Sequence, residues 1–270
     1  MLSGNPPERM RIGDILVARH TVDEVVALVS QRLSGPATAP LAVGSVNLDH
    51  LHHFRAGPAG IEGAPEWMWL ADGAPVAWRG SRLDGRPWPR VTGADLLEPL
   101  LEGCAAHGIR VGFFGGLPVT HRRLAAVLAA RYPTSEPARF WSPTREEIEC
   151  PNASARLAAE IAAARVHLLV VGLGKPRQEW WIDRHGMDTG AGVLLAFGAA
   201  ADFLAGVVKR APDFYQRQGL EWLYRLRQEP RRLARRYLVQ GPPAFLQLRH
   251  ATLESGGVRP RTTAPPGRQP

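Results

Sequence analysis

Short apolar runs alternate with longer amphipathic segments through most of the chain, and this alternation limits the folds it can adopt. Buried strands are predicted at residues 41–46, 110–114, 166–171 and 193–197, because each run is short, apolar and followed by glycine or asparagine. Segments with helical spacing stand between them, which predicts an α/β fold: a parallel sheet with helices on both faces. Such sheets bind ligands beyond the carboxyl ends of their strands, so candidate site residues are sought in the loops there.

The helical segments are identified by apolar spacing and by the residues that end them. Gly108 stops one helix and Pro133 stops another. Residues 48–54 also show helical spacing, and residues 67–70 are a further short apolar run. The expected helices cover residues 22–33, 94–107, 119–131 and 152–165, and another begins at residue 179.

Residues 190–208 form an apolar run long enough to be considered as a transmembrane helix. Four glycines and the central Asp202 argue against a spanning helix and favour a buried strand, a turn and a short helix. Residues 1–19 contain charged side chains and no apolar leader segment, so we expect a cytoplasmic protein. The two cysteines, Cys104 and Cys150, exclude a disulfide framework and a cysteine-based zinc site.

Positive charge is concentrated near the C-terminus. The net charge is +8, and residues 209–250 contribute ten basic and three acidic residues. Around Pro230, leucines and arginine pairs recur at helical spacing, which predicts two amphipathic cationic helices. Such helices suit an anionic membrane, where each basic residue contributes about 1 kcal/mol; a charged solvent-facing side over a core stripe is the alternative. We therefore expect a sheet domain at 1–208, a basic helical appendage at 209–250 and a disordered tail at 251–270.

Three nearby histidines, His50, His52 and His53, suggest a metal-binding cluster at first sight. His50 and His53 could share one helix face, but the adjacent carboxylate, Asp49, points elsewhere. We therefore expect no metal site at these residues.

Polar side chains follow two of the apolar runs. Asp72 follows the run that ends at residue 70, where a carboxylate could act as a general base that accelerates a reaction about 10²–10⁴-fold. A turn or a helix cap explains Asp72 equally well. Ser45 and Asn47 stand at the end of another run and are suited to bind a hydroxylated substrate, although Asn47 could instead cap the helix that follows.

Glycine-rich turns follow two further strands. Gly115 and Gly116 could let backbone N–H groups approach an anion, or could simply form a tight turn, and the dinucleotide-binding fingerprint is missing. The loop 172–179, Gly-Leu-Gly-Lys-Pro-Arg-Gln-Glu, adds two cations and two further polar residues, which favours a ligand role. Lys209 and Arg210 are suited to bind phosphate, or simply end an element.

Taken in this order, these segments resemble the WecG/TagA/CpsF family of bacterial glycosyltransferases. The resemblance extends over roughly residues 40–248 and rests on seven pieces in register. Two features depart from the family pattern: Ser45 replaces a commoner threonine, and alanines replace the usual glycine and phenylalanine just before Asp202. The matching segments are 45–47, 71–73, 90–95, 114–116, 172–179, 202–212 and 219–237.

The resemblance implies a Rossmann-like catalytic domain with a C-terminal helical appendage. It implies metal-independent, inverting transfer of a sugar from a UDP-sugar, without a cofactor, in the synthesis of cell-surface polysaccharide. The donor in the best-known members is UDP-N-acetylmannosamine or its uronic acid, and the acceptor is N-acetylglucosamine on undecaprenyl diphosphate. The enzyme would then act peripherally on the inner face of the cell membrane.

The resemblance also assigns roles to residues. The proposed base falls on Asp72, two residues near the donor fall on Ser45 and Asn47, and a conserved glutamine falls on Gln178. Arginines that contact diphosphate and membrane fall among Arg225, Arg232 and Arg235. The other expected substrate-binding residues are Arg90, Gly93, Asp95, Gly115, Gly116, Gly174, Pro176, Glu179, Asp202, Lys209 and Arg210.

The rival interpretation is a non-catalytic nucleotide- or nucleic-acid-binding module, which explains the charge of the appendage and the glycine loops. It gives no role to Asp72 or Gln178, and the interleaved aromatic residues typical of nucleic-acid binding are missing. We therefore expect a UDP-sugar, a lipid-linked saccharide and an anionic membrane surface as partners, and no nucleic acid. The sequence does not determine the oligomeric state, and a homo-oligomer is one of the states it allows.

Overall fold

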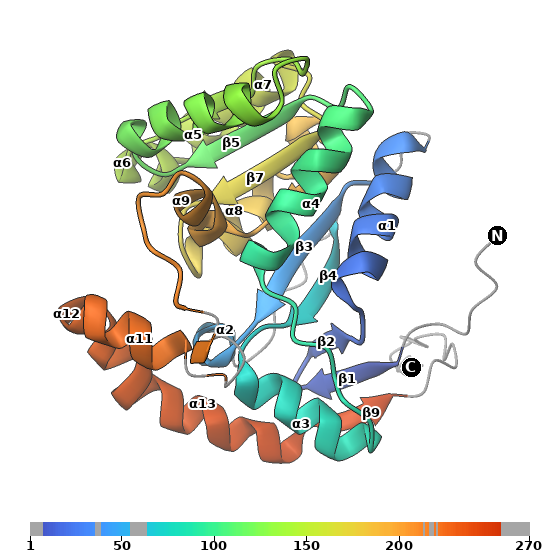
Figure 1. The fold of residues 1–270 in the computed structure, drawn as a ribbon, viewed down its shortest axis with the longest axis vertical. Helices are drawn as coiled ribbons and strands as arrows, with labels where there is room; N and C mark the ends of the chain where they lie inside the picture. Colours follow the sequence, from blue (N-terminus) through green and yellow to red (C-terminus); the bar gives the residue numbers. More distant parts are fainter. Residues whose placement is uncertain are drawn as a thin grey trace, which may run out of the picture.

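The computed structural model describes residues 8–35, 39–54, 64–212, 214–215, 219 and 221–254 (Figure 1). Within these residues a nine-stranded sheet is packed against helices, which confirms the α/β, Rossmann-like fold. The strands are β1 (Arg9–Ile12), β2 (Ile15–Ala18), β3 (Leu41–Val46), β4 (Glu66–Ala71), β5 (Val111–Gly115), β6 (Arg139–Trp141), β7 (Leu168–Gly172), β8 (Val193–Leu195) and β9 (Thr252–Glu254).

The sheet has the strand order β6-β5-β7-β8-β3-β4-β2-β1-β9. The pairs from β6 to β2 are parallel, whereas β1 is antiparallel to both β2 and β9. In the register of β3 and β4, Ser45 lies opposite Leu70 and Val46 lies opposite Ala71. The two strands therefore end together, and the residues that follow them, Asn47 and Asp72, emerge side by side.

Helices cover both faces of the sheet because successive strand residues point to opposite sides. In β7, Leu168 and Val170 pack into one core cluster, whereas Leu169 and Val171 pack into another. On the first face lie α1 (Val22–Ser34), α4 (Gly93–Ala106), α5 (Pro118–Arg131) and α9 (Gly198–Leu204). On the other lie α7 (Pro151–Ala163) and α8 (Arg177–His185), with α6 (Arg145–Glu149) and the short η1 (Met187–Thr189) packed against α7.

Several elements were not expected from the sequence. The four-residue strands β1 and β2 form a hairpin whose turn begins at Gly13, at φ 60°. Helix α3 (Ala74–Asp84) begins after Gly73, has a proline in its first turn and ends at Gly85 in the left-handed conformation, which are recognisable signals. The strand β6 has only three residues, too few to show a period.

Residues 252–254 correct the predicted C-terminal tail. They form β9, which pairs with β1, and the side chains of Arg11 and Glu254 form an ion pair at 2.5 Å. The disordered tail predicted for 251–270 is therefore wrong at its start, and residues 255–270 lie outside the described residues.

The basic appendage is a series of short helices that runs across the end of the sheet where β3 and β4 finish (Figure 1). Its last part is built into the body, because Ala244 and Leu248 are buried in a cluster with residues of β1, β2 and β4. The elements are α11 (Glu221–Gln228), α12 (Pro230–Ala234), the π-helical η2 (Arg235–Gln240), α13 (Gly241–Gln247) and η3 (Leu248–His250), and α13 packs on α2 (Leu48–His53).

Candidate active site

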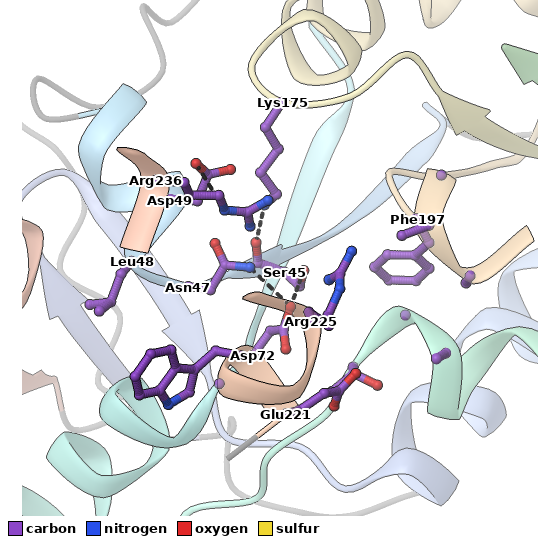
Figure 2. Close-up of a pocket in the computed structure, with 18 of the residues that line it drawn as sticks. Ser45, Asn47, Leu48, Asp49, Asp72, Lys175, Phe197, Glu221, Arg225 and Arg236 are labelled. Atoms are coloured by element: carbon purple, nitrogen blue, oxygen red, sulfur yellow. Dashed lines mark hydrogen bonds and ion pairs between the residues drawn. The ribbon is translucent and has the colours of Figure 1, made fainter. Parts of the chain in front are cut away.

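A cavity of about 930 Å³ lies between the carboxyl ends of the central strands and the appendage (Figure 2). Its walls come from loops after β3, β4, β7 and β8 and from α11, η2 and α13. The structure therefore brings together residues that are far apart in the sequence. Nine of the predicted site residues line this cavity: Ser45, Asn47, Asp72, Arg90, Gly93, Gly174, Gln178, Asp202 and Arg225.

Asp72 is held by the two polar residues predicted at the end of β3. Ser45 Oγ donates a hydrogen bond to Asp72 Oδ2 at 3.2 Å, and Asn47 Nδ2 donates to the same oxygen at 3.1 Å (Figure 2). The side-chain oxygen of Asn47 accepts from the backbone N–H of His50 at 3.1 Å, so Asn47 also caps helix α2. The capping interpretation of Asn47 is therefore confirmed, whereas its binding of a hydroxylated substrate stays a prediction. The arrangement fixes one carboxylate oxygen of Asp72 in the cavity wall.

The loop between β7 and α8 supplies a second group of polar residues. Gln178 Nε2 donates to Glu179 Oε1 at 3.1 Å and to the carbonyl oxygen of Ala196 at 2.9 Å. Glu179 is 1% exposed and does not line the cavity, so it supports Gln178 from behind. Pro176 precedes α8 at its N-cap position and also lies outside the cavity lining.

The start of α4 connects the sheet domain to the appendage. Asp95 accepts a hydrogen bond from Thr92 Oγ1 at 2.7 Å and forms an ion pair with Arg210. Burial raises the pKa of Asp95, but the hydrogen bonds from Arg210 and Thr92 and the charge of Arg210 outweigh burial and lower it. Asp95 and Arg210 thus bind each other beside the cavity, whereas Lys209 is exposed.

Arginines from the appendage enter the cavity, but not all in the expected register. Arg225 lines it and lies over the ring of Phe203, with 5.7 Å from Cζ to the ring centre. Arg236, which was not predicted, also lines it and forms an ion pair with Asp49 at 3.2 Å. Arg235 is exposed instead. Arg232 lies in α12, and its side chain is outside the described part of the chain.

Charged residues of the body bind other parts of the appendage and of α5. Arg90 lies 3.7 Å from Glu221 of α11, which connects the loop before α4 to the appendage. Asp202 accepts a hydrogen bond from Thr120 Oγ1 at 3.2 Å. The pair of Asp49 and Arg236 could not be found from the sequence, because the two residues are 187 positions apart and no pattern in the sequence links them.

Gly115 and Gly116 are not among the described residues that line the cavity. A side chain at Gly115 would place its Cβ 2.6 Å from the carbonyl oxygen of Gly172, and one at Gly198 would lie 2.6 Å from the Cα of Gly172. Gly115 and Gly198 therefore let the ends of β5 and β7 and the start of α9 approach closely. The role of Gly115 and Gly116 as an anion site remains a prediction.

The histidines near residue 50 do not face one another as ligands. His50 is buried and stacks on Phe54, whereas His52 and His53 meet edge to face. In the described part of the chain, no three His, Cys, Asp or Glu side chains gather closely enough to hold a metal ion. Among the same residues, no helix is both long and apolar enough to cross a membrane.

A comparison with known families decides what this site belongs to. The model of the family described as "Glycosyl transferase WecG/TagA/CpsF family" matches residues 10–256. The chain belongs to this family. It is therefore a glycosyltransferase of cell-surface polysaccharide synthesis, with a sugar nucleotide as donor and a lipid-linked acceptor in general terms.

The match to the WecG/TagA/CpsF family extends beyond the segments that carried the resemblance. It includes most of the hairpin of β1 and β2 and the terminal strand β9. The sheet edge that the sequence did not reveal is therefore part of the family domain.

Proposed function

We propose that this glycosyltransferase moves a sugar of the N-acetylmannosamine type from a UDP-sugar to a saccharide on a polyprenyl diphosphate. The transfer inverts the anomeric carbon and needs neither a metal ion nor a cofactor. Asp72 is the general base, and it accepts the proton of the acceptor hydroxyl as that oxygen attacks the sugar. The bond from the sugar to the UDP oxygen breaks in the same step.

The observation that carries the proposal is the fixed carboxylate of Asp72 in the wall of the large cavity. Ser45 and Asn47 both donate to Oδ2. Both hydrogen bonds hold one oxygen of the carboxylate, so the other oxygen is the better placed to accept a proton from a substrate. A base positioned in this way accelerates a reaction about 10²–10⁴-fold.

The departing UDP develops negative charge, which cationic side chains can stabilise. Arg225 and Arg90 line the cavity and are suited to this task. Glu221 binds Arg90, and Asp49 binds Arg236. Both acids also line the cavity, so each ion pair limits where its guanidinium group can point. Binding of the diphosphate would then draw on arginines that the appendage holds over the cavity.

The acceptor lipid is expected to stay in the membrane, so the enzyme must work at its surface. Exposed apolar residues of the appendage include Leu238 and Val239, and Arg231 and Arg235 of the same stretch of sequence are also exposed. Basic and apolar side chains on one helical segment suit the surface of an anionic bilayer. We therefore place the enzyme on the cytoplasmic face of the membrane as a peripheral protein.

The substitution Asp72→Asn tests the proposal, because it keeps the shape of the side chain but removes the base. Transfer to a synthetic polyprenyl-diphosphate acceptor should fall at least about 100-fold, while calorimetry should show UDP binding within threefold of wild type. The matched control is Asp188→Asn, a change of an exposed acid in η1. Unchanged turnover in Asp72→Asn would remove this residue from the mechanism, and a panel of UDP-sugars would identify the donor.

A further inference from the structure

Lys175 lies in the cavity wall, and its ammonium group has three partners. Its side chain is 11% exposed. Nζ donates to the backbone carbonyl oxygen of Ser45 at 2.5 Å (Figure 2). It also donates to His50 Nδ1 at 3.3 Å and lies 3.4 Å from Glu179 Oε1. A lysine so enclosed, with one anionic partner and two neutral acceptors, is held in a single place.

His50 is a fixed acceptor for this ammonium group. Burial lowers the pKa of His50 well below its usual value, and the charges of Lys175 and His53 lower it further. The ring is therefore neutral, and its Nδ1 can accept a hydrogen bond from Lys175. Because the ring centre lies 4.5 Å from those of both Phe54 and Trp69, the imidazole is fixed from two sides.

The contacts of Lys175 lead to the carboxylate of Asp72 by two short routes. One passes through Ser45, whose backbone oxygen binds Lys175 and whose hydroxyl group donates to Asp72. The other passes through His50, whose backbone N–H binds the Asn47 side chain that also donates to Asp72. Lys175 therefore binds both ends of the segment 45–50, and this segment contains Ser45 and Asn47, the two donors to Asp72.

The third contact, with Glu179, leads to Gln178, which also lines the cavity. Glu179 accepts from Gln178, and both N–H groups of the Gln178 amide are used by Glu179 and the carbonyl of Ala196. The side-chain oxygen of Gln178 is then the atom that remains for a ligand. Lys175 thus connects the support of Asp72 to the support of Gln178 through a single ammonium group.

We infer that Lys175 is a positioning residue that sets the place of Asp72 by holding the segment 45–50 against α8. The effect on transfer rests on the proposed role of Asp72, whereas the effect on segment 45–50 does not. Lys175 need not touch the substrate in this role. Its loss should therefore lower kcat and leave the KM for the donor nearly unchanged.

The test compares Lys175→Met with Arg184→Met, which removes an exposed cation from α8, the helix that follows the loop of Lys175. Lys175→Met should lower kcat at least tenfold and change the donor KM less than threefold. In hydrogen–deuterium exchange, the peptide that spans 45–51 should exchange at least fivefold faster. Arg184→Met should match wild type in all three measurements.

Chemical restoration separates positioning from general damage to the fold. Lys175→Cys should be as impaired as Lys175→Met, and alkylation with 2-bromoethylamine should return at least half of kcat by restoring the ammonium group. Alkylated wild type is the control for Cys150, which is exposed. If Lys175→Met fails to fold because Glu179 is left unpaired, the double variant Lys175→Met/Glu179→Gln takes its place in every measurement.

Three results would overturn the inference: a wild-type kcat in Lys175→Met, a loss confined to KM, or no restoration in a folded alkylated protein. Failure of the proposed function looks different. In that case wild type itself transfers no sugar, and exchange in 45–51 still shows whether Lys175 holds this segment.

Discussion

Asn47 contacts Asp72 with one end of its side-chain amide and caps helix α2 with the other, at 3.1 Å in both cases. The side chain thus connects the start of a helix to the candidate base on the neighbouring strand. A single residue serves a structural and a chemical purpose, and substitutions can separate the two.

The variants Asn47→Ser and Asn47→Ala should differ in stability and agree in activity. Serine caps a helix about as well as asparagine, whereas alanine costs about 0.5–2 kcal/mol of unfolding free energy. Both remove the amide donor to Asp72, so both should lower kcat at least tenfold. Urea denaturation and steady-state kinetics measure the two effects. Full activity in Asn47→Ser would show that the hydrogen bond from the Asn47 amide to Asp72 does not matter for transfer.

The two glycines after β5 should respond differently to alanine. Gly116 needs only its positive φ of 87°, and the nearest atom to a new Cβ is 3.6 Å away, so Gly116→Ala should cost about 1–2 kcal/mol of unfolding free energy. Gly115 has a φ of 94° and would also press its Cβ against the Gly172 carbonyl, so Gly115→Ala should cost about 3 kcal/mol or more. Denaturation in urea compares them.

Equal losses in the two variants would contradict the packing explanation. A normal stability of Gly116→Ala together with a tenfold loss of UDP affinity would instead support the predicted anion site.

The sequence predicted the part of the site that follows from strand ends. Ser45, Asn47 and Asp72 were found because each stands at the end of an apolar run or just after it, and parallel strands end at one edge of the sheet. It could not distinguish a cap from a ligand at Asn47, because that choice depends on the register between β3 and β4. The pair of Asp49 and Arg236 was not predicted for a different reason: only the docking of the appendage brings these two residues together.

The fold was predictable where a segment was long enough to show the periodic spacing of apolar residues that is typical of a helix or a strand. Helices such as α4 and buried strands such as β7 were found close to their limits. The hairpin of β1 and β2 and the strand β9 were missed because strands of three or four residues show no clear alternation of apolar and polar side chains. The pairing of β1 with β9 also depends on tertiary structure, which the local sequence does not show. The close contacts of Gly115 with Gly172 likewise depend on two strands that are separated in the sequence.

The ion pair between Asp95 and Arg210 should make stability depend on pH at the acidic end. The pKa of Asp95 is lowered in the folded protein, so its contribution is present above its ordinary pKa of 3.8 and is lost as the pH falls through the lower, folded value. Asp95→Asn should therefore cost about 1 kcal/mol of unfolding free energy at pH 6, since each side chain is 27% exposed. The difference from wild type should shrink steadily below pH 3.8. Denaturation curves at several pH values measure it, and a difference that stays constant down to pH 2.5 would show that Asp95 does not titrate as argued.

Membrane binding is best tested by charge, because Ala244, Leu248 and β9 are part of the core and a truncation before them would damage the fold. The double variant Arg231→Gln/Arg235→Gln changes two exposed arginines of the appendage. At about 1 kcal/mol for each cation, its partition coefficient onto vesicles rich in anionic lipid should fall about 30-fold. The matched control is Arg122→Gln/Arg123→Gln, which removes the same charge from exposed positions on α5. Co-sedimentation with vesicles, repeated at high salt, compares the three proteins. Equal losses in both variants would point to net charge alone, and no loss in either would mean that the appendage does not bring this enzyme to the bilayer.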